Sequence, residues 1–96
     1  MYKKELKKLS LKAGIFKALA HPSRIFILER LMEREYCVME LTKLIGVEMP
    51  TISKHLSILK NVGIITFRKE NNNVYYRILC ECVKNTLACA DKALEQ

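Results

Sequence analysis

The sequence lacks the features that identify membrane proteins and secreted proteins. No apolar run in it approaches the roughly 20 residues that a membrane span needs. Its lysine-rich N-terminus has neither an apolar stretch nor a small-residue cleavage site, so it does not have the form of a signal peptide. These absences predict a soluble, cytoplasmic protein that makes no contact with a membrane.

Common catalytic and phosphate-binding patterns are also missing. The 96 residues include three glycines and two histidines, with no glycine-rich phosphate loop and no Ser/His/Asp arrangement. The chain has no repeats, linkers or low-complexity segments. We therefore expect residues 1–96 to form a single domain that is not an enzyme. Because a domain of this size buries a modest fraction of its surface, dimerisation would add to its buried area.

What the sequence does have is an excess of positive charge. The formal net charge is +7, and it is unevenly distributed, since residues 81–96 carry −1 and residues 1–80 carry +8. A basic chain without a disordered composition is typical of a protein that binds a polyanion, with phosphate contacts supplying much of the affinity. The same charge is also compatible with a basic protein whose lysines serve only to keep it soluble.

Two short helical patterns joined by a turn form the centre of the sequence. Gly46 ends the first helix, and Pro50 begins the second, where a missing N–H is tolerated. The apolar residues at helical spacing are Val38, Leu41, Leu44 and Ile45 in the first helix, and Ile52, Leu56 and Leu59 in the second. This arrangement predicts a helix-turn-helix unit, with its second helix over residues 50–61.

The second helix has a polar outer face, and a basic hairpin is predicted after it. Hydroxyl, amine and imidazole groups on that face are suited to phosphates and base edges in a major groove. Two β-prone runs, residues 64–68 and 74–79, flank a polar turn and predict the hairpin. The candidate groove contacts are Thr51, Ser53, Lys54, His55 and Ser57, and the candidate backbone contacts on the hairpin are Arg68, Lys69 and Arg77. Together these elements predict a winged helix.

Residues 17–25, KALAHPSRI, and residues 50–65, PTISKHLSILKNVGII, closely resemble the ArsR (arsenical-resistance repressor) family, over roughly residues 10 to 80. The resemblance implies a mainly α winged helix-turn-helix with a small β-hairpin wing. It also implies a homodimeric repressor that binds a near-palindromic double-stranded DNA operator. His21 resembles the family's His-Pro pair, so we interpret it as a turn and capping residue. The segment 36–38 is expected to add a third strand to the wing sheet.

The resemblance further implies that the first and last helices form the dimer interface. The first helix is expected over residues 3–20, the second from the His-Pro pair to about residue 35, and the last from residue 81 to about residue 94. The apolar stripes of the first and last helices are Leu6, Leu9, Ala13 and Phe16, and Val83, Leu87, Ala90 and Leu94.

The cysteines are the candidate sensing residues. Metal-sensing members of the family have a Cys-Val-Cys motif where this chain has Cys37 followed by Met39, so the usual arsenite site is incomplete. Cys80 and Cys82 could chelate one soft ion through thiolates. A third thiol could come from Cys37 or from the partner protomer. Cys89 lies about 10.5 Å along a helix from Cys82, too far to share an ion without bending, and we expect it to be a core residue.

Three interpretations of these thiols remain open. The first is a site for arsenite, antimonite or a soft divalent metal as inducer. The second is a reversible disulfide or persulfide switch. The third is that small buried cysteines only pack. Two other protein classes also remain open, namely a thiol metal-storage or redox protein that does not bind DNA, and a winged helix that holds protein partners. Glu48 and Met49 depart from the family's usual polar residues, so no operator preference follows from the resemblance.

Overall fold

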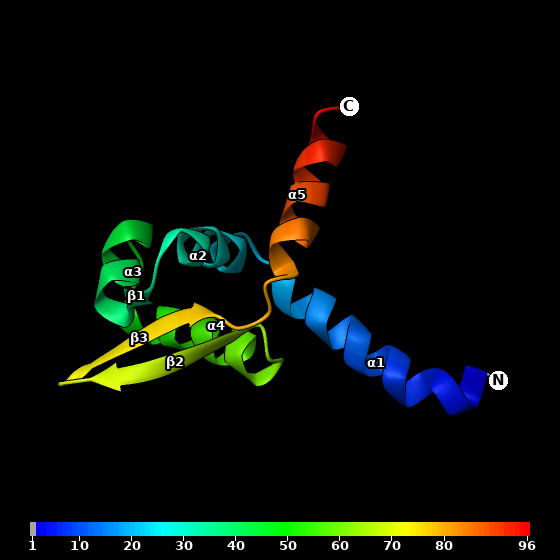
Figure 1. Ribbon diagram of the computed structural model, residues 1–96, viewed down its shortest axis with the longest axis horizontal. Helices are drawn as coiled ribbons and strands as arrows, with labels where there is room; N and C mark the ends of the chain where they lie inside the picture. Colours follow the sequence, from blue (N-terminus) through cyan, green and yellow to red (C-terminus); the bar gives the residue numbers. More distant parts are fainter. Residues whose placement is uncertain (1) are drawn as a thin grey trace.

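A computed structural model describes residues 2–96, which fold into five helices and a three-stranded sheet. The elements in chain order are α1 (Tyr2–Leu19), α2 (Pro22–Glu33), β1 (Tyr36–Cys37), α3 (Val38–Ile45), α4 (Met49–Asn61), β2 (Ile65–Glu70), β3 (Asn73–Ile78) and α5 (Val83–Leu94). In Figure 1, α2, α3, α4 and the sheet gather into one body, while α1 and α5 extend from it in different directions. The predicted mainly α winged helix-turn-helix is confirmed. No helix in residues 2–96 is long and apolar enough to cross a membrane.

The wing is an antiparallel sheet with the strand order β1-β3-β2. Tyr36 of β1 lies opposite Tyr76 of β3, so the predicted third strand is confirmed. Asn71 occupies the turn between β2 and β3 with φ 57°, a left-handed conformation that asparagine tolerates better than most residues. The short turn projects the polar end of the hairpin away from the body (Figure 1).

The helix-turn-helix is held by a compact apolar core. Gly46 ends α3 with φ 81°, and Pro50 lies in the first turn of α4, as the sequence predicted. The apolar side of α4 is completely buried, since Ile52, Leu56 and Leu59 have 0% exposure. Burying each such side chain contributes about 1.5–3 kcal/mol relative to leaving it exposed. The orientation of α4, and hence of its outer face, is therefore set by the core.

Two caps fix the starts of α2 and α3. His21 is the N-cap of α2, where its Nδ1 accepts a hydrogen bond from the Ser23 N–H at 3.1 Å, which confirms its expected role. At the start of α3, the Cys37 N–H donates to Glu40 Oε1 at 2.9 Å. This backbone hydrogen bond, with a smaller contribution from Arg34, lowers the pKa of the Glu40 carboxyl. Such caps satisfy N–H groups that have no partner within their helices.

Two predicted helix boundaries are wrong in detail. The second helix ends at Glu33 instead of residue 35, because the chain becomes extended at Arg34 before β1 pairs with β3. The last helix begins at Val83 instead of residue 81. Tyr75 and Tyr76 point to opposite faces of β3, and both are half-buried. The Arg68 guanidinium covers the Tyr75 ring, while Phe67 packs near Tyr76.

The two outer helices leave much of their apolar surface uncovered within the protomer. Only Ala18 and Leu19 of α1 are buried, and only Val83 and Leu87 of α5. The exposed apolar side chains on these helices include Leu6, Leu9, Leu11, Ile15, Phe16 and Leu94. A patch of this kind is typical of a surface that another chain covers.

Candidate nucleic-acid interface and cysteine site

The outer face of α4 presents polar side chains to solvent. Lys54 and Ser57 are exposed, as are Thr51 and Ser53, while His55 is half-buried. The opposite face packs into the core, so the helix divides sharply into an anchored side and an accessible side. The C-terminal part of α4 also touches the wing, where Lys60 Nζ lies 5.1 Å from the centre of the Phe67 ring. The structure therefore leaves all of the predicted α4 contacts except His55 fully open to a ligand.

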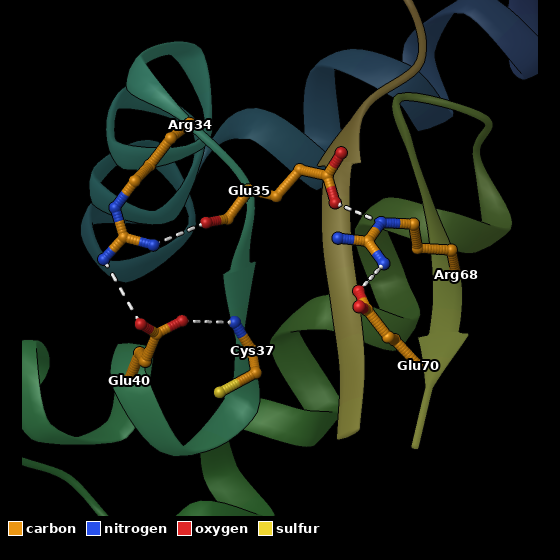
Figure 2. Close-up of polar contacts among 6 residues, drawn as sticks. All are labelled: Arg34, Glu35, Cys37, Glu40, Arg68 and Glu70. Carbon is orange, nitrogen blue, oxygen red and sulfur yellow. Dashed lines mark hydrogen bonds and ion pairs between the residues drawn. The ribbon is translucent and has the colours of Figure 1, made fainter. Parts of the chain in front are cut away.

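Arg68 on the wing is less available than the sequence predicted. Its Nε lies 2.7 Å from Glu35 Oε1, and its Nη1 pairs with the Glu70 carboxylate. Figure 2 shows both carboxylates directed at the one guanidinium. The hydrogen bond with Glu70, followed by that with Glu35, raises the pKa of Arg68. The sequence alone indicates Glu70 as a carboxylate near Arg68, but it gives no sign of Glu35, which lies 33 positions away in the chain.

Lys69 and Arg77 are the more accessible cations of the wing. Both are exposed, and within residues 2–96 neither makes an ion pair. In the β2–β3 register Lys69 lies opposite Val74, near the turn, and Arg77 lies opposite Thr66, near the body. The two charges are thus spread along the hairpin and lie on opposite faces of the sheet, because side chains alternate along a strand.

A second polar cluster connects the helix-turn-helix to the sheet. Arg34 Nη2 lies 3.3 Å from Glu40 Oε2, and Arg34 Nη1 donates to the Glu35 carbonyl oxygen at 2.7 Å (Figure 2). The same guanidinium lies 3.7 Å from the centre of the Tyr36 ring. Glu40 then bonds the backbone of Cys37. This cluster, which the sequence pattern did not reveal, joins the end of α2, β1 and the start of α3.

The structure brings two of the four cysteines together. Cys80 and Cys82 line an apolar hollow of about 220 Å³ between α1 and α5, together with Phe16 and Leu19. A hydrogen bond with Cys80 raises the pKa of the exposed Cys82 thiol. Two adjacent thiols suit a thiophilic ion in part, because tetrahedral or trigonal sites need further ligands.

The other two cysteines lie elsewhere. Cys37 lies opposite Tyr75 in the pairing of β1 with β3. Tyr75 is in β3, five residues before Cys80, which follows the end of that strand. Cys37 is thus not placed beside the end of the wing, where it could complete the site. Cys89 was expected in the core but is exposed on α5, because the apolar face of that helix is only partly covered within the protomer. In the described residues, no three His, Cys, Asp or Glu side chains are grouped to hold a metal ion.

The fold and the polar face of α4 define a winged helix-turn-helix protein, and comparison with known proteins identifies its family. The family model described as "Bacterial regulatory protein, arsR family" matches residues 21–66. The HTH-type transcriptional regulator Rv0081 of Mycobacterium tuberculosis is 41% identical over 85 residues, which cover 88% of this chain and 75% of that protein. The transcriptional repressor SmtB of the same species is 41% identical over 64 residues, which cover 67% of this chain and 47% of that protein.

Solved structures agree with the sequence relatives. The crystal structure of Rv0081 has a TM-score of 0.82 with 40% identity and covers 91% of this chain and 88% of that one. The solution structure of the homodimeric winged helix-turn-helix DNA-binding domain Mb0332 from Mycobacterium bovis has a TM-score of 0.86 with 29% identity, covering 99% and 88%. The chain belongs to the ArsR family. It is a DNA-binding transcriptional regulator and not an enzyme.

Proposed function

We propose that the chain is a homodimeric repressor, acting as one winged domain, that places α4 of each protomer in a major groove of a near-palindromic operator. The observation that carries the proposal is the division of α4 into a buried apolar side and an exposed face with Lys54 and Ser57. Lys69 and Arg77 on the adjoining hairpin would contact the flanking backbone. Thr51 and Ser53 would contact bases or phosphates at the start of α4, where a recognition helix usually meets base edges.

Dimerisation through α1 and α5 is the second part of the proposal. Leu6, Leu9 and Phe16 on α1 and Leu94 on α5 are exposed in the single protomer. A second copy would cover these side chains and would also supply the two-fold symmetry that a palindromic operator requires. The homodimeric state of the related Mb0332 domain supports this arrangement.

A footprint on the DNA upstream of the protein's own gene tests the DNA-binding part. The wild-type protein should protect two half-sites about one helical turn apart, or a multiple of that spacing. Lys54→Gln should weaken binding about tenfold, because it removes a phosphate contact. Lys92→Gln removes the same charge from α5 and should bind as the wild type does. Equal affinities for the two variants would contradict the assignment of the α4 face.

The inducer site that we propose comprises Cys80 and Cys82. Arsenite or antimonite would exchange two of its hydroxyl groups for the two sulfur atoms and release two water molecules, whereas a soft divalent metal would displace the two thiol protons. A further ligand would come from the partner protomer or a small thiol. The hollow between α1 and α5 lies against the proposed dimer helices, so a ligand there would favour one arrangement of the dimer over another. An inducer that binds the DNA-incompetent arrangement more tightly shifts the population away from the operator.

A thiol switch is the second candidate for the same pair of cysteines. A two-electron oxidant would remove two protons and two electrons from the adjacent thiols and leave a Cys80–Cys82 disulfide. The position of both cysteines in the lining of one hollow supports this chemistry. The raised pKa of Cys82 opposes it in part, because the thiolate is the reactive form.

Titration of the operator complex separates these candidates. Arsenite, antimonite, cadmium, zinc and a peroxide are each added to the wild type and to Cys80→Ser, Cys82→Ser and Cys89→Ser. A soft ion that releases the wild type and Cys89→Ser, but neither of the other variants, supports the metal or metalloid site. Release only by peroxide, and reversal by a dithiol, supports the switch. A complex that none of the additions affects would identify a repressor without a thiol-dependent inducer.

A further inference from the structure

A basic hollow lies between the first turn of α2 and the middle of α4. Its volume is about 520 Å³. The His21 and His55 rings form one part of its wall, with centroids 4.5 Å apart and planes inclined by 52°. The residues that line it are His21, Arg24, Thr51, Lys54, His55 and Ile58. This lining includes two permanent cations and two imidazoles but no carboxylate, so the hollow is suited to an anion.

Two nitrogen atoms at this hollow lack partners. Arg24 Nε and His55 Nδ1 are shielded from solvent and make no hydrogen bond to any part of the described chain. Leaving such atoms unpaired costs free energy, because they lose hydrogen bonds to water and gain none within the protein. His21 Nδ1 is already engaged, because it accepts the Ser23 N–H. Arg24 on α2 and His55 on α4 therefore each have an unpaired nitrogen atom, and the two side chains line the same hollow from different helices.

We infer that this hollow binds one phosphodiester group of the operator backbone, with Arg24 and His55 as its ligands. The inference rests on the proposed placement of α4 in the major groove. Thr51 and Lys54 belong both to the exposed face of α4 and to the lining of the hollow, so a strand that follows this face passes its opening. Phosphate oxygens accept hydrogen bonds from a guanidinium and from an imidazolium. A free phosphate ion has the same chemistry, and the experiment distinguishes the two sources.

The charges around His55 make this contact sensitive to pH. Burial lowers the pKa of His55, and nearby His21, Arg24 and Lys54 lower it further. Lys17 of α1 lines an adjacent hollow together with Arg24, so α1 also contributes a cation near this site. A bound phosphate would offset these charges and raise the pKa of His55. DNA binding would then take up at most one proton per protomer, so affinity should rise as the pH falls, by at most about tenfold per pH unit for each protomer.

Replacement of single phosphates by methylphosphonates tests the contact directly. Each replacement removes one negative charge at a known position of the operator. In the wild type, one replacement per half-site should weaken binding about tenfold. The same replacement should have little further effect on Arg24→Gln or His55→Gln, because the partner is already lost. Arg30→Gln is the matched control, since Arg30 is on the same helix but pairs with Glu33 at 3.4 Å and lies over Phe26.

The pH dependence supplies an independent readout. The wild-type affinity should rise from pH 8 to pH 6 more steeply than that of His55→Gln, whereas Arg30→Gln should follow the wild type. If Arg24→Gln does not fold, His55→Gln and Lys54→Gln provide the same comparison with the methylphosphonates.

Two results would overturn the inference while leaving DNA binding intact. The first is that every methylphosphonate penalty adds fully to those of Arg24→Gln and His55→Gln. The second is that inorganic phosphate shifts the NMR signals of the His55 ring without competing with DNA, which would make the hollow a free-anion site. A wild-type protein that protects no DNA would instead refute the proposed function itself.

Discussion

The winged body and the two outer helices differ in how much of their apolar surface is buried within a single protomer. In the body, Leu41 and Leu56 are completely buried, so α3 and α4 have their partners within the protomer. On the outer helices, Phe16 of α1 is 63% exposed and Leu94 of α5 is 83% exposed. The body therefore has a core of its own, whereas α1 and α5 expose the kind of surface that forms a core only between two chains.

Under the proposed function, the winged body binds DNA and the junction with the outer helices binds the inducer. The proposed DNA-binding face of α4 belongs to the winged body, and Cys80 and Cys82 lie where this body joins the outer helices. In the proposed dimer, a ligand at that junction would change how the two winged bodies are oriented relative to each other, without disturbing the core of either protomer.

Leu9→Glu should have the largest effect, because it places a charge in the proposed interface of two outer helices. We expect dimers to dissociate and operator affinity to fall about 10²- to 10⁴-fold, since each body then binds its half-site alone. Sedimentation and DNA titration measure the two effects. Lys8→Gln makes the same change in net charge on the same helix and should remain dimeric. A dimeric, tightly binding Leu9→Glu protein would show that α1 is not at the interface.

Leu56→Ala should destabilise the body much more than Leu94→Ala destabilises the protomer. A cavity in the packed core costs about 2–5 kcal/mol. Truncation of an exposed side chain usually changes stability by less than about 0.5 kcal/mol. Denaturant unfolding of both variants in the monomeric Leu9→Glu background measures the difference. Similar losses for the two truncations would contradict the division between body and outer helices.

Lys69→Gln should change DNA binding more than Arg68→Gln does. Lys69 makes no ion pair among residues 2–96, so its loss should reduce the salt dependence of log K by about one unit for each wing in contact. Arg68 is already paired with Glu35 and Glu70, and its loss should leave the salt slope nearly unchanged. Affinity measured over a series of salt concentrations tests this order. The reverse order would mean that Arg68 leaves its carboxylates when DNA binds.

Glu40→Gln should cause the smallest effect, visible in the pH dependence of stability. The pKa of Glu40 is lowered in the folded protein, so its charged form stabilises the fold above the ordinary value of 4.5. That contribution is lost as the pH falls through the lowered pKa. The stability difference between wild type and Glu40→Gln should thus shrink as the pH falls below 4.5. A stability difference that stays constant as the pH falls would contradict this role of the Glu40 carboxylate.

The sequence predicted those features that depend on local geometry. Apolar spacing identified the inward side of α4 because an α-helix repeats every 3.6 residues. Gly46 marked the end of α3 because glycine adopts positive φ without a steric cost. The tight turn at Asn71 follows from the same kind of local preference. Each of these signals involves residues only a few positions apart.

The pairings that shape the candidate sites join residues far apart in the chain, so they depend on how the helices and strands pack together. The packing of α2 against the sheet sets Glu35 beside Arg68 and so reduces the charge that the wing offers to DNA. The register of β1 and β3 places Cys37 opposite Tyr75 and away from the other thiols. The packing of α2 on α4 brings His21 to His55 and creates the basic hollow. Sequence periodicity determines which side of an element is buried, but not which distant side chain it meets there, because that depends on how the elements pack.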